Sequence, residues 1–307
     1  MSPDLLRVRL RNQRLVGPRC RTPAEVVGWF GAVQAQDYAA AKWALALRTR
    51  RATERDVEAA FDRRDIIRTH VLRPTWHFVL PEDLRWMLAL TAPRVKQAMA
   101  FHGRWLGIDD KAISRAKARL ENALAGGRQL TRAELARLLH ATGPKLAHLV
   151  MFAELDAVVC SGPRRGKQFT YALVDERCPP ATPLDGDEAL GRLAERYFRS
   201  HGPALPRDFA WWSGLTAAGA RRAIDIAGLT ARDGRWSKSW TPSRAGPVAH
   251  FLPNFDEFLV AYKVRERREL SSALIVDGRL VESVRGLTAP ERRAVAEAHA
   301  RYSAYRK

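Results

Sequence analysis

Apolar residues recur at helical spacing through the first third of the chain and then give way to an alternating pattern. A helix is predicted to begin after Thr22, which can cap it, because Pro23 suits the first helical position and Glu25 can complete a capping box. Further helices are predicted over residues 39–47 and from residue 53 onward. Residues 66–72 and 75–80 are β-branched and aromatic, and they predict a two-stranded ribbon. Helices followed by such a hairpin are typical of a winged helix.

The same order of helices and extended segments recurs in the middle of the chain. A helix is predicted over residues 112–124, a second begins at a capping box that starts with Thr131, and a third runs over residues 146–159. A short basic turn at residues 162–167 then leads into a strand over residues 168–174. This pattern predicts a second winged helix, with a hairpin that is positively charged at its tip.

A third set of elements follows the Pro-rich segment at residues 178–183. Asp277-Gly278 lies between two apolar segments and predicts a β-hairpin near the end of the chain. Helices are predicted over residues 188–200, 206–213, 216–226 and 290–302. We therefore predict a mainly helical α+β protein of three tandem winged-helix units, with β-hairpin wings and a β-rich C-terminal segment. The predicted units are residues 1–103, 104–178 and 179–307.

The chain is strongly basic, with 52 Lys and Arg against 33 Asp and Glu and a formal net charge of +19. The excess is spread along the chain, so it belongs to folded elements rather than to a disordered arm. Each phosphate that Lys or Arg neutralises releases a counterion, and composition therefore favours nucleic acid as the partner. The alternative is the Arg-rich and Ala-rich usage of a GC-rich genome, which composition does not distinguish from a polyanion partner.

The apolar segments do not predict a membrane protein or a secreted one. The segment at residues 149–160 is interrupted by Glu154 and Asp156 and is shorter than the roughly 20 residues that a membrane span needs. The first residues lack the apolar core of a secretory signal, so we expect a cytoplasmic protein. The three cysteines form no CxxC pair and no close Cys/His cluster, so we expect no metal site.

Several short motifs follow one another in a characteristic order. They lie at residues 31–37, 73–77, 153–156, 160–163, 169–173, 201–203, 208–215 and 252–257. Each is weak alone, but in this order they resemble the AlkZ-like family of DNA glycosylases over nearly the whole chain. The resemblance implies three tandem winged helices, duplex DNA containing alkylated purines as the substrate, and no cofactor. It also implies a monofunctional, monomeric enzyme that hydrolyses the N-glycosidic bond of N7-alkylated purines, including guanines in interstrand crosslinks.

The catalytic signature of that family is Gln-x-Gln or Gln-x-Asp, and Gln34-Ala35-Gln36 matches the first form. The resemblance therefore implies that Gln34 and Gln36 are catalytic. The pair alone is nearly uninformative, and the other interpretation is a polar helix end. Residues two apart point away from each other in a helix but share a face in an extended segment, so the pair must follow the end of the helix that begins near residue 23.

The chemistry of two glutamines suits a cationic leaving group. An amide is not a strong general base, which excludes an ordinary two-carboxylate glycosidase at this motif. Alkylation at N7 makes guanine a cation that leaves as a neutral base, while positive charge develops on the sugar. The carbonyl oxygens of Gln34 and Gln36 would position a water and stabilise that charge without proton transfer. Unmodified bases would be spared because they are poor leaving groups.

Several side chains are candidate contacts to DNA or to the site. His77 either contacts phosphate or the lesion or is a hydrogen-bonded structural residue. Asp37 is expected to cap a helix rather than support the water. Asp256 and Glu257 are left out of the catalytic set because such acids in a basic protein usually pair with Arg. The candidate phosphate contacts are Arg164, Arg165 and Lys167 at the second wing, and Arg221 and Arg222 on a later helix, with a solvated charged surface as the alternative.

Two other functions fit the same fold. A winged-helix transcriptional regulator or nucleoid protein would bind DNA tightly and with strong salt dependence but release no base. In an RNA- or drug-sequestering protein, affinity for the alkylating metabolite would replace the chemistry.

Overall fold

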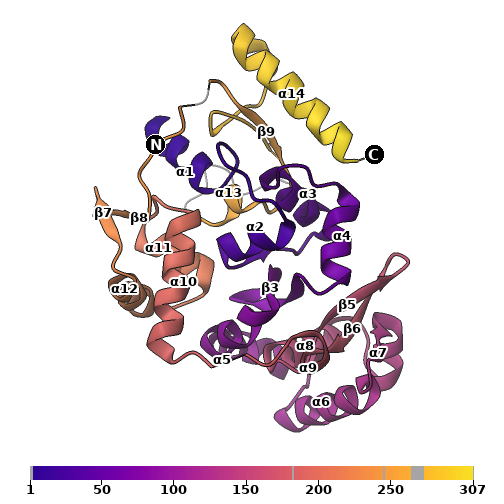
Figure 1. Ribbon diagram of the computed structural model, residues 1–307. Coiled ribbons are helices and arrows are strands. Elements are labelled where there is room, and N and C mark those ends of the chain that lie inside the picture. Colours follow the sequence, from indigo (N-terminus) through magenta and orange to yellow (C-terminus); the bar gives the residue numbers. More distant parts are fainter. Residues whose placement is uncertain (1–2, 182, 245, 264–272, 307) are drawn as a thin grey trace.

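The computed structural model describes residues 3–181, 183–244, 246–263 and 273–306 (Figure 1). The N-terminal third contains, in order, α1 (Pro3–Asn12), α2 (Pro23–Phe30), β1 (Val33–Gln34), α3 (Tyr38–Arg48), α4 (Glu54–Asp62), β2 (Ile67–Val71) and β3 (Arg73–Val79). The predicted helices and the ribbon are confirmed here. The helix α1 and the short strand β1 were not predicted.

Local capping explains where these helices begin. The Thr22 hydroxyl accepts a hydrogen bond from the Glu25 amide at 3.1 Å, while the Glu25 carboxylate accepts from the amide of Arg21 rather than Thr22. Thr53 begins α4 with a complete capping box. Asp37 caps α3, because its Oδ1 accepts from the Ala40 amide at 3.1 Å, as the sequence predicted.

The first sheet is antiparallel and has the strand order β1-β3-β2, so β1 is an edge strand. Residue Val33 pairs with Phe78 and Gln34 pairs with His77. One face of the sheet contributes Phe78 of β3 to a buried cluster that also includes Phe30 of α2 and Phe61 of α4. Burial of these rings stabilises the packing of α2 and α4 against the sheet.

The middle of the chain begins with a long helix that was not predicted from the sequence. The elements are α5 (Pro81–Trp105), α6 (Asp110–Leu124), β4 (Leu130–Thr131), α7 (Arg132–Leu139), α8 (Gly143–Leu155), β5 (Val159–Arg165), β6 (Gln168–Leu173) and α9 (Val174–Arg177). The helix predicted to reach residue 159 was wrong at its end. It stops at Leu155 because Ala157 adopts a positive φ of 55°, and the chain then enters β5.

The last part contains a helical group and then a small sheet. Its elements are α10 (Gly186–Ser200), α11 (Pro206–Ser213), α12 (Ala217–Ile226), β7 (Thr230–Arg232), β8 (Arg235–Ser237), β9 (Ala249–Leu252), α13 (Glu257–Val260), β10 (Ala273–Val276), β11 (Arg279–Leu280), η1 (Val284–Gly286) and α14 (Ala289–Tyr305). The predicted helices and the hairpin at Asp277-Gly278 are confirmed. The β7–β8 hairpin was not predicted.

The C-terminal part packs back onto the N-terminal third, with α14 and β9 close to α3 (Figure 1). Trp43 lies against Tyr305, with ring centroids 4.8 Å apart, and its Nε1 donates to the carbonyl of Phe251 at 2.7 Å.

The helices and small antiparallel sheets confirm the predicted α+β, mainly helical fold class. The winged-helix character of the units and the boundaries 1–103, 104–178 and 179–307 stay predictions. Within the described ranges, no helix is both long and apolar enough for a membrane crossing.

Candidate active site

The two glutamines lie in the extended connection between α2 and α3. Gln34 ends the edge strand β1, and the amide of Ala35 continues the pairing by donating to the carbonyl of Trp76 at 2.7 Å. The Gln34 side chain is buried, whereas Gln36 is exposed. The Gln36 Oε1 accepts a hydrogen bond from the Trp76 amide at 3.3 Å. The prediction that the pair follows the end of the preceding helix is thus confirmed.

A row of buried polar side chains crosses the sheet at Gln34. Gln34 of β1 pairs with His77 of β3, which in turn pairs with Thr69 of β2. Directly paired residues in antiparallel strands place their side chains on the same face. Three buried atoms in this row, Gln34 Oε1, His77 Nε2 and Thr69 Oγ1, have no hydrogen-bond partner among the described residues. Buried polar atoms are normally satisfied, so this row is suited to holding a donor such as water.

The protonation state of His77 determines how many hydrogen bonds a molecule bound in this row must donate. Its Nδ1 lies 2.9 Å from the carbonyl oxygen of Thr75, which only accepts, so Nδ1 carries the proton. Burial, reinforced by the charge of Arg73, lowers the pKa of His77 to about 3, and the ring is neutral at pH 7. Its Nε2 is therefore an acceptor, as is the Gln34 carbonyl oxygen. Two acceptors in adjacent positions call for a molecule that donates two hydrogen bonds.

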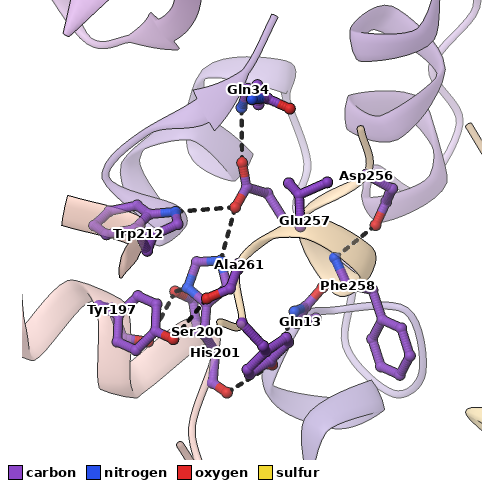
Figure 2. Close-up of polar contacts among 12 residues, drawn as sticks. Gln13, Gln34, Tyr197, Ser200, His201, Trp212, Asp256, Glu257, Phe258 and Ala261 are labelled. Carbon is purple, nitrogen blue, oxygen red and sulfur yellow. Dashed lines mark hydrogen bonds and ion pairs between the residues drawn. The ribbon is translucent and has the colours of Figure 1, made fainter. Parts of the chain in front are cut away.

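Glu257 holds the free edge of β1 in place (Figure 2). Its Oε1 accepts from the Gln34 backbone amide at 2.7 Å. Its Oε2 lies 3.1 Å from His201 Nε2 and accepts from Trp212 Nε1 at 3.0 Å. Glu257 thereby connects the strand that carries Gln34 to helices α10 and α11. The expectation that this acid pairs with Arg was wrong, and it applies only to Asp256, which forms an ion pair with Arg48 at 2.7 Å.

Glu257 is ionised despite its burial. Burial alone would raise the pKa of the carboxyl, but the hydrogen bond from His201 and the Gln34 amide outweigh it and lower the pKa to about 2. Burial also lowers the pKa of His201, so we describe the pair as a carboxylate that accepts from a neutral imidazole. The carboxylate is buried next to the backbone of β1, where it holds the strand in place and is shielded from solvent.

This carboxylate gives a pH prediction. Because its pKa is lowered on folding from 4.5 to about 2, its contribution to the free energy of unfolding is present above pH 4.5 and is lost as the pH falls toward 2. In Glu257→Gln, we expect lower stability at pH 7, by about 1–3 kcal/mol, because the new amide group faces the N–H groups of His201 and Trp212. Urea unfolding of both proteins between pH 7 and 3 measures this. Equal slopes of stability against pH in the two proteins would contradict the assignment.

A family model described as DNA glycosylase AlkZ-like matches residues 27–268, which include both glutamines and Glu257. The chain belongs to this family of DNA glycosylases. It is similar to the solved structure of the Streptomyces sahachiroi DNA glycosylase AlkZ, with a TM-score of 0.79 and 20% sequence identity over 99% of this chain and 96% of that one. At that identity the likeness shows the fold. A search of curated proteins found no match.

The predicted phosphate contacts at the turn between β5 and β6 differ in their surroundings. The Arg164 guanidinium turns back toward Glu58, at 3.4 Å, and lies over the ring of Tyr38. Arg165 is exposed but contacts Glu134 at 3.1 Å. Lys167 is exposed at the turn. Among the described residues, Arg164 and Arg165 form ion pairs with acidic side chains and Lys167 forms none.

The remaining candidates lie apart from this turn. Arg221 and Arg222 are exposed on α12, and Arg222 pairs with Asp187 at 2.8 Å. His77 is fully buried, which argues against a contact with phosphate. In the parts of the chain that the structure describes, no group of three or more His, Cys, Asp or Glu side chains is placed to hold a metal ion.

Proposed function

We propose that this DNA glycosylase hydrolyses the N-glycosidic bond of N7-alkylated purines in duplex DNA, with Gln34 and Gln36 as its catalytic residues. Family membership supports the glycosylase class. The substrate and the catalytic role of the glutamines are supported by the buried Gln34 carbonyl oxygen. This atom has no hydrogen-bond partner among the described residues, and it is held on a strand fixed by Glu257. A fixed, unsatisfied amide dipole is a preorganised electrostatic group.

The reaction uses the positive charge of the lesion. Alkylation at N7 allows the base to leave neutral, so no residue needs to protonate it. As the bond breaks, positive charge develops on the sugar, and the carbonyl oxygens of Gln34 and Gln36 stabilise it. Water then adds to C1′ and loses a proton to solvent, which leaves an abasic site. Because Gln36 is exposed, a bulky or crosslinked lesion need not enter a closed pocket, and crosslinks are included in the proposal.

We assign His77 a role in holding the attacking water. Its Nε2 and the Gln34 Oε1 are both acceptors, and one water can donate a hydrogen bond to each. Such a water keeps its lone pairs free for C1′. His77 has too low a pKa to act as a general base at pH 7, so it orients the water and does not deprotonate it.

Substituting His77 separates this role from DNA binding. In His77→Leu we expect the single-turnover rate of base release to fall about tenfold, the effect of roughly one hydrogen bond, with unchanged DNA affinity. His77→Asn offers an acceptor to the water and should recover part of the rate. Single-turnover kinetics and fluorescence anisotropy on the same duplex measure both quantities. A loss of affinity with an unchanged rate would instead support a phosphate contact.

Duplex DNA containing a single 7-methylguanine tests the function itself. We expect free 7-methylguanine and an abasic site to appear faster with the protein than without it, and no release of unmodified guanine. A winged-helix regulator predicts binding without release, and a sequestering protein predicts affinity for the free alkylating metabolite. Because a bulkier adduct is also a candidate substrate, the assay includes one. Binding without release from either adduct would support the regulator.

Basic side chains are expected to contact the phosphates that flank the lesion. Arg164, Arg165 and Lys167 are placed at one hairpin, and Arg221 and Arg222 on α12. The pairing of Arg164, Arg165 and Arg222 with acids reduces their expected share of the binding energy, because an ion pair must be opened before phosphate is bound.

A further inference from the structure

A basic cavity of about 750 Å³ lies beside the Gln-x-Gln segment, between the first sheet and the α7–α8 region. Its volume is in the range of ligand-binding pockets. Its lining includes Arg68, Trp76, Arg132, Gly143, Lys167 and Phe169. The described lining includes three cations and no Asp or Glu. The cavity therefore has the charge of an anion site.

Arg68 is the buried part of this site. It is 4% exposed, and its guanidinium lies 4.4 Å from the ring centroid of Trp76 and 4.5 Å from that of Phe169. Its Nε donates to the carbonyl of Ala35 at 3.0 Å, yet no carboxylate of the described residues lies within ion-pair distance. The nearby Glu154 is occupied by His70 and by Trp76 Nε1.

A buried cation without an ion-pair partner is costly, and the charge of the nearby Glu154 offsets only part of that cost. Burial lowers the pKa of Arg68 to about 10, which leaves the guanidinium charged at pH 7. An anionic ligand in the cavity would offset this cost.

Two further groups converge on the cavity from the other side. Arg132 is the first residue of α7 and is exposed, and Lys167 extends from the β5–β6 turn. The 13-residue helix α8 begins there, and its N-cap Thr142 makes no side-chain capping hydrogen bond. The positive end of the α8 dipole therefore adds to the three cationic side chains.

We propose that this cavity binds a sugar–phosphate unit of the DNA strand, with the phosphate between Arg68, Arg132 and Lys167. The inference rests on the proposed DNA substrate but not on the glycosidic chemistry. Strand alternation places Arg68 and Trp76 on the face of the sheet opposite to His77 and Gln34. The bound unit is therefore a neighbour of the lesion and not the nucleotide that is hydrolysed.

The cavity also has a direct connection to the catalytic segment. Arg68 bonds to the carbonyl of Ala35, between the two glutamines, and the Trp76 amide bonds to Gln36 Oε1. A DNA phosphate bound at Arg68 would thus fix the position of the DNA strand relative to Gln36. The cavity explains how an exposed glutamine is aligned with one nucleotide of a duplex.

The test combines charge removal on the protein with charge removal on the DNA. Arg132→Ala and Lys167→Ala are titrated at several salt concentrations with a lesion-free duplex and with a duplex carrying an uncleavable abasic analogue. Each substitution should lower the slope of log affinity against log salt by about 0.9 and weaken binding about tenfold. A set of duplexes, each with one neutral methylphosphonate, then locates the phosphate. At one position, the methylphosphonate should weaken binding to the wild type but not to Arg132→Ala.

Arg137→Ala, an exposed cation at the other end of α7, is the matched control and should show no such coupling. The proposal is overturned if no methylphosphonate position couples to Arg132 or Lys167, or if Arg137 couples equally. Base release is scored separately. Coupling without any base release would retain the cavity assignment and reject the glycosylase mechanism, whereas release without coupling would do the reverse.

Discussion

Gln34→Ala should slow base release by about 10²-fold, with DNA affinity close to that of the wild type. In the proposed mechanism the substitution removes a preorganised dipole that stabilises the charge on the sugar, and removal of one such group typically costs two to three orders of magnitude in rate. The backbone of β1 stays in place, because the Glu257 carboxylate bonds to the main-chain amide of residue 34 and not to its side chain. Single-turnover release of 7-methylguanine at saturating enzyme measures the effect.

The control for that experiment is Gln97→Ala, which removes an exposed glutamine on α5. It should release the base at the wild-type rate. If Gln34→Ala also matches the wild type, Gln34 is a buried structural residue and the assignment of its carbonyl oxygen is wrong. If instead its thermal stability falls sharply, the rate loss has to be measured well below the melting temperature.

Asp256→Asn should lower the free energy of unfolding by about 3–5 kcal/mol, the usual cost of leaving a buried charge without its partner. Arg48 and Asp256 form a two-pronged ion pair with Nη–Oδ distances of 2.7 and 2.8 Å, and their side chains are 2% and 0% exposed. The pair joins α3 to the start of α13, immediately before Glu257. Urea denaturation followed by circular dichroism measures the change.

Asp187→Asn is the matched control for this pair. Asp187 forms its ion pair with Arg222 at the surface, so solvent screens the interaction and we expect no measurable loss of stability. A loss in Asp256→Asn no larger than in Asp187→Asn would show that the buried pair does not stabilise the fold.

Much of the fold could be predicted because local signals decide where most helices begin. Caps at Thr53, Thr131 and Thr216 begin helices that the sequence pattern located within a few residues. The helix α5 was missed because Pro93 lies inside it and interrupts the pattern that usually marks a helix. Its buried face, which includes Leu84, Met87 and Leu88, is stabilised by tertiary packing that no local signal reveals.

The sequence predicted where the two glutamines of the candidate site lie, but it did not predict their surroundings. The motif located Gln34 and Gln36, and the hairpin signal located the strand of His77. The contact between Glu257 and Gln34 joins residues more than two hundred positions apart, and spacing carries no information about such a pair. The motif at residues 252–257 is the one signal that could have marked Glu257. The polar row through Thr69 depends on strand register, which the sequence alone did not define.

The burial of Arg68 could not be predicted for the same reason, because it depends on contacts between segments that are far apart in the sequence. As an isolated arginine in a β-branched segment it resembled the other distributed cations of the chain. Only the packing of β6 against the first sheet places Phe169 over its guanidinium and encloses it.

The most direct test of the proposed function is the single-turnover release of free base from a duplex with one N7-alkylguanine. The rate is compared between the wild type and the Gln34→Ala/Gln36→Ala double variant at equal bound DNA. Both a 7-methylguanine and a bulky N7-guanine adduct are used. We expect release by the wild type and, in the double variant, release at the spontaneous rate with DNA binding retained. Equal release by both proteins, or binding by the wild type without release from either adduct, would contradict it.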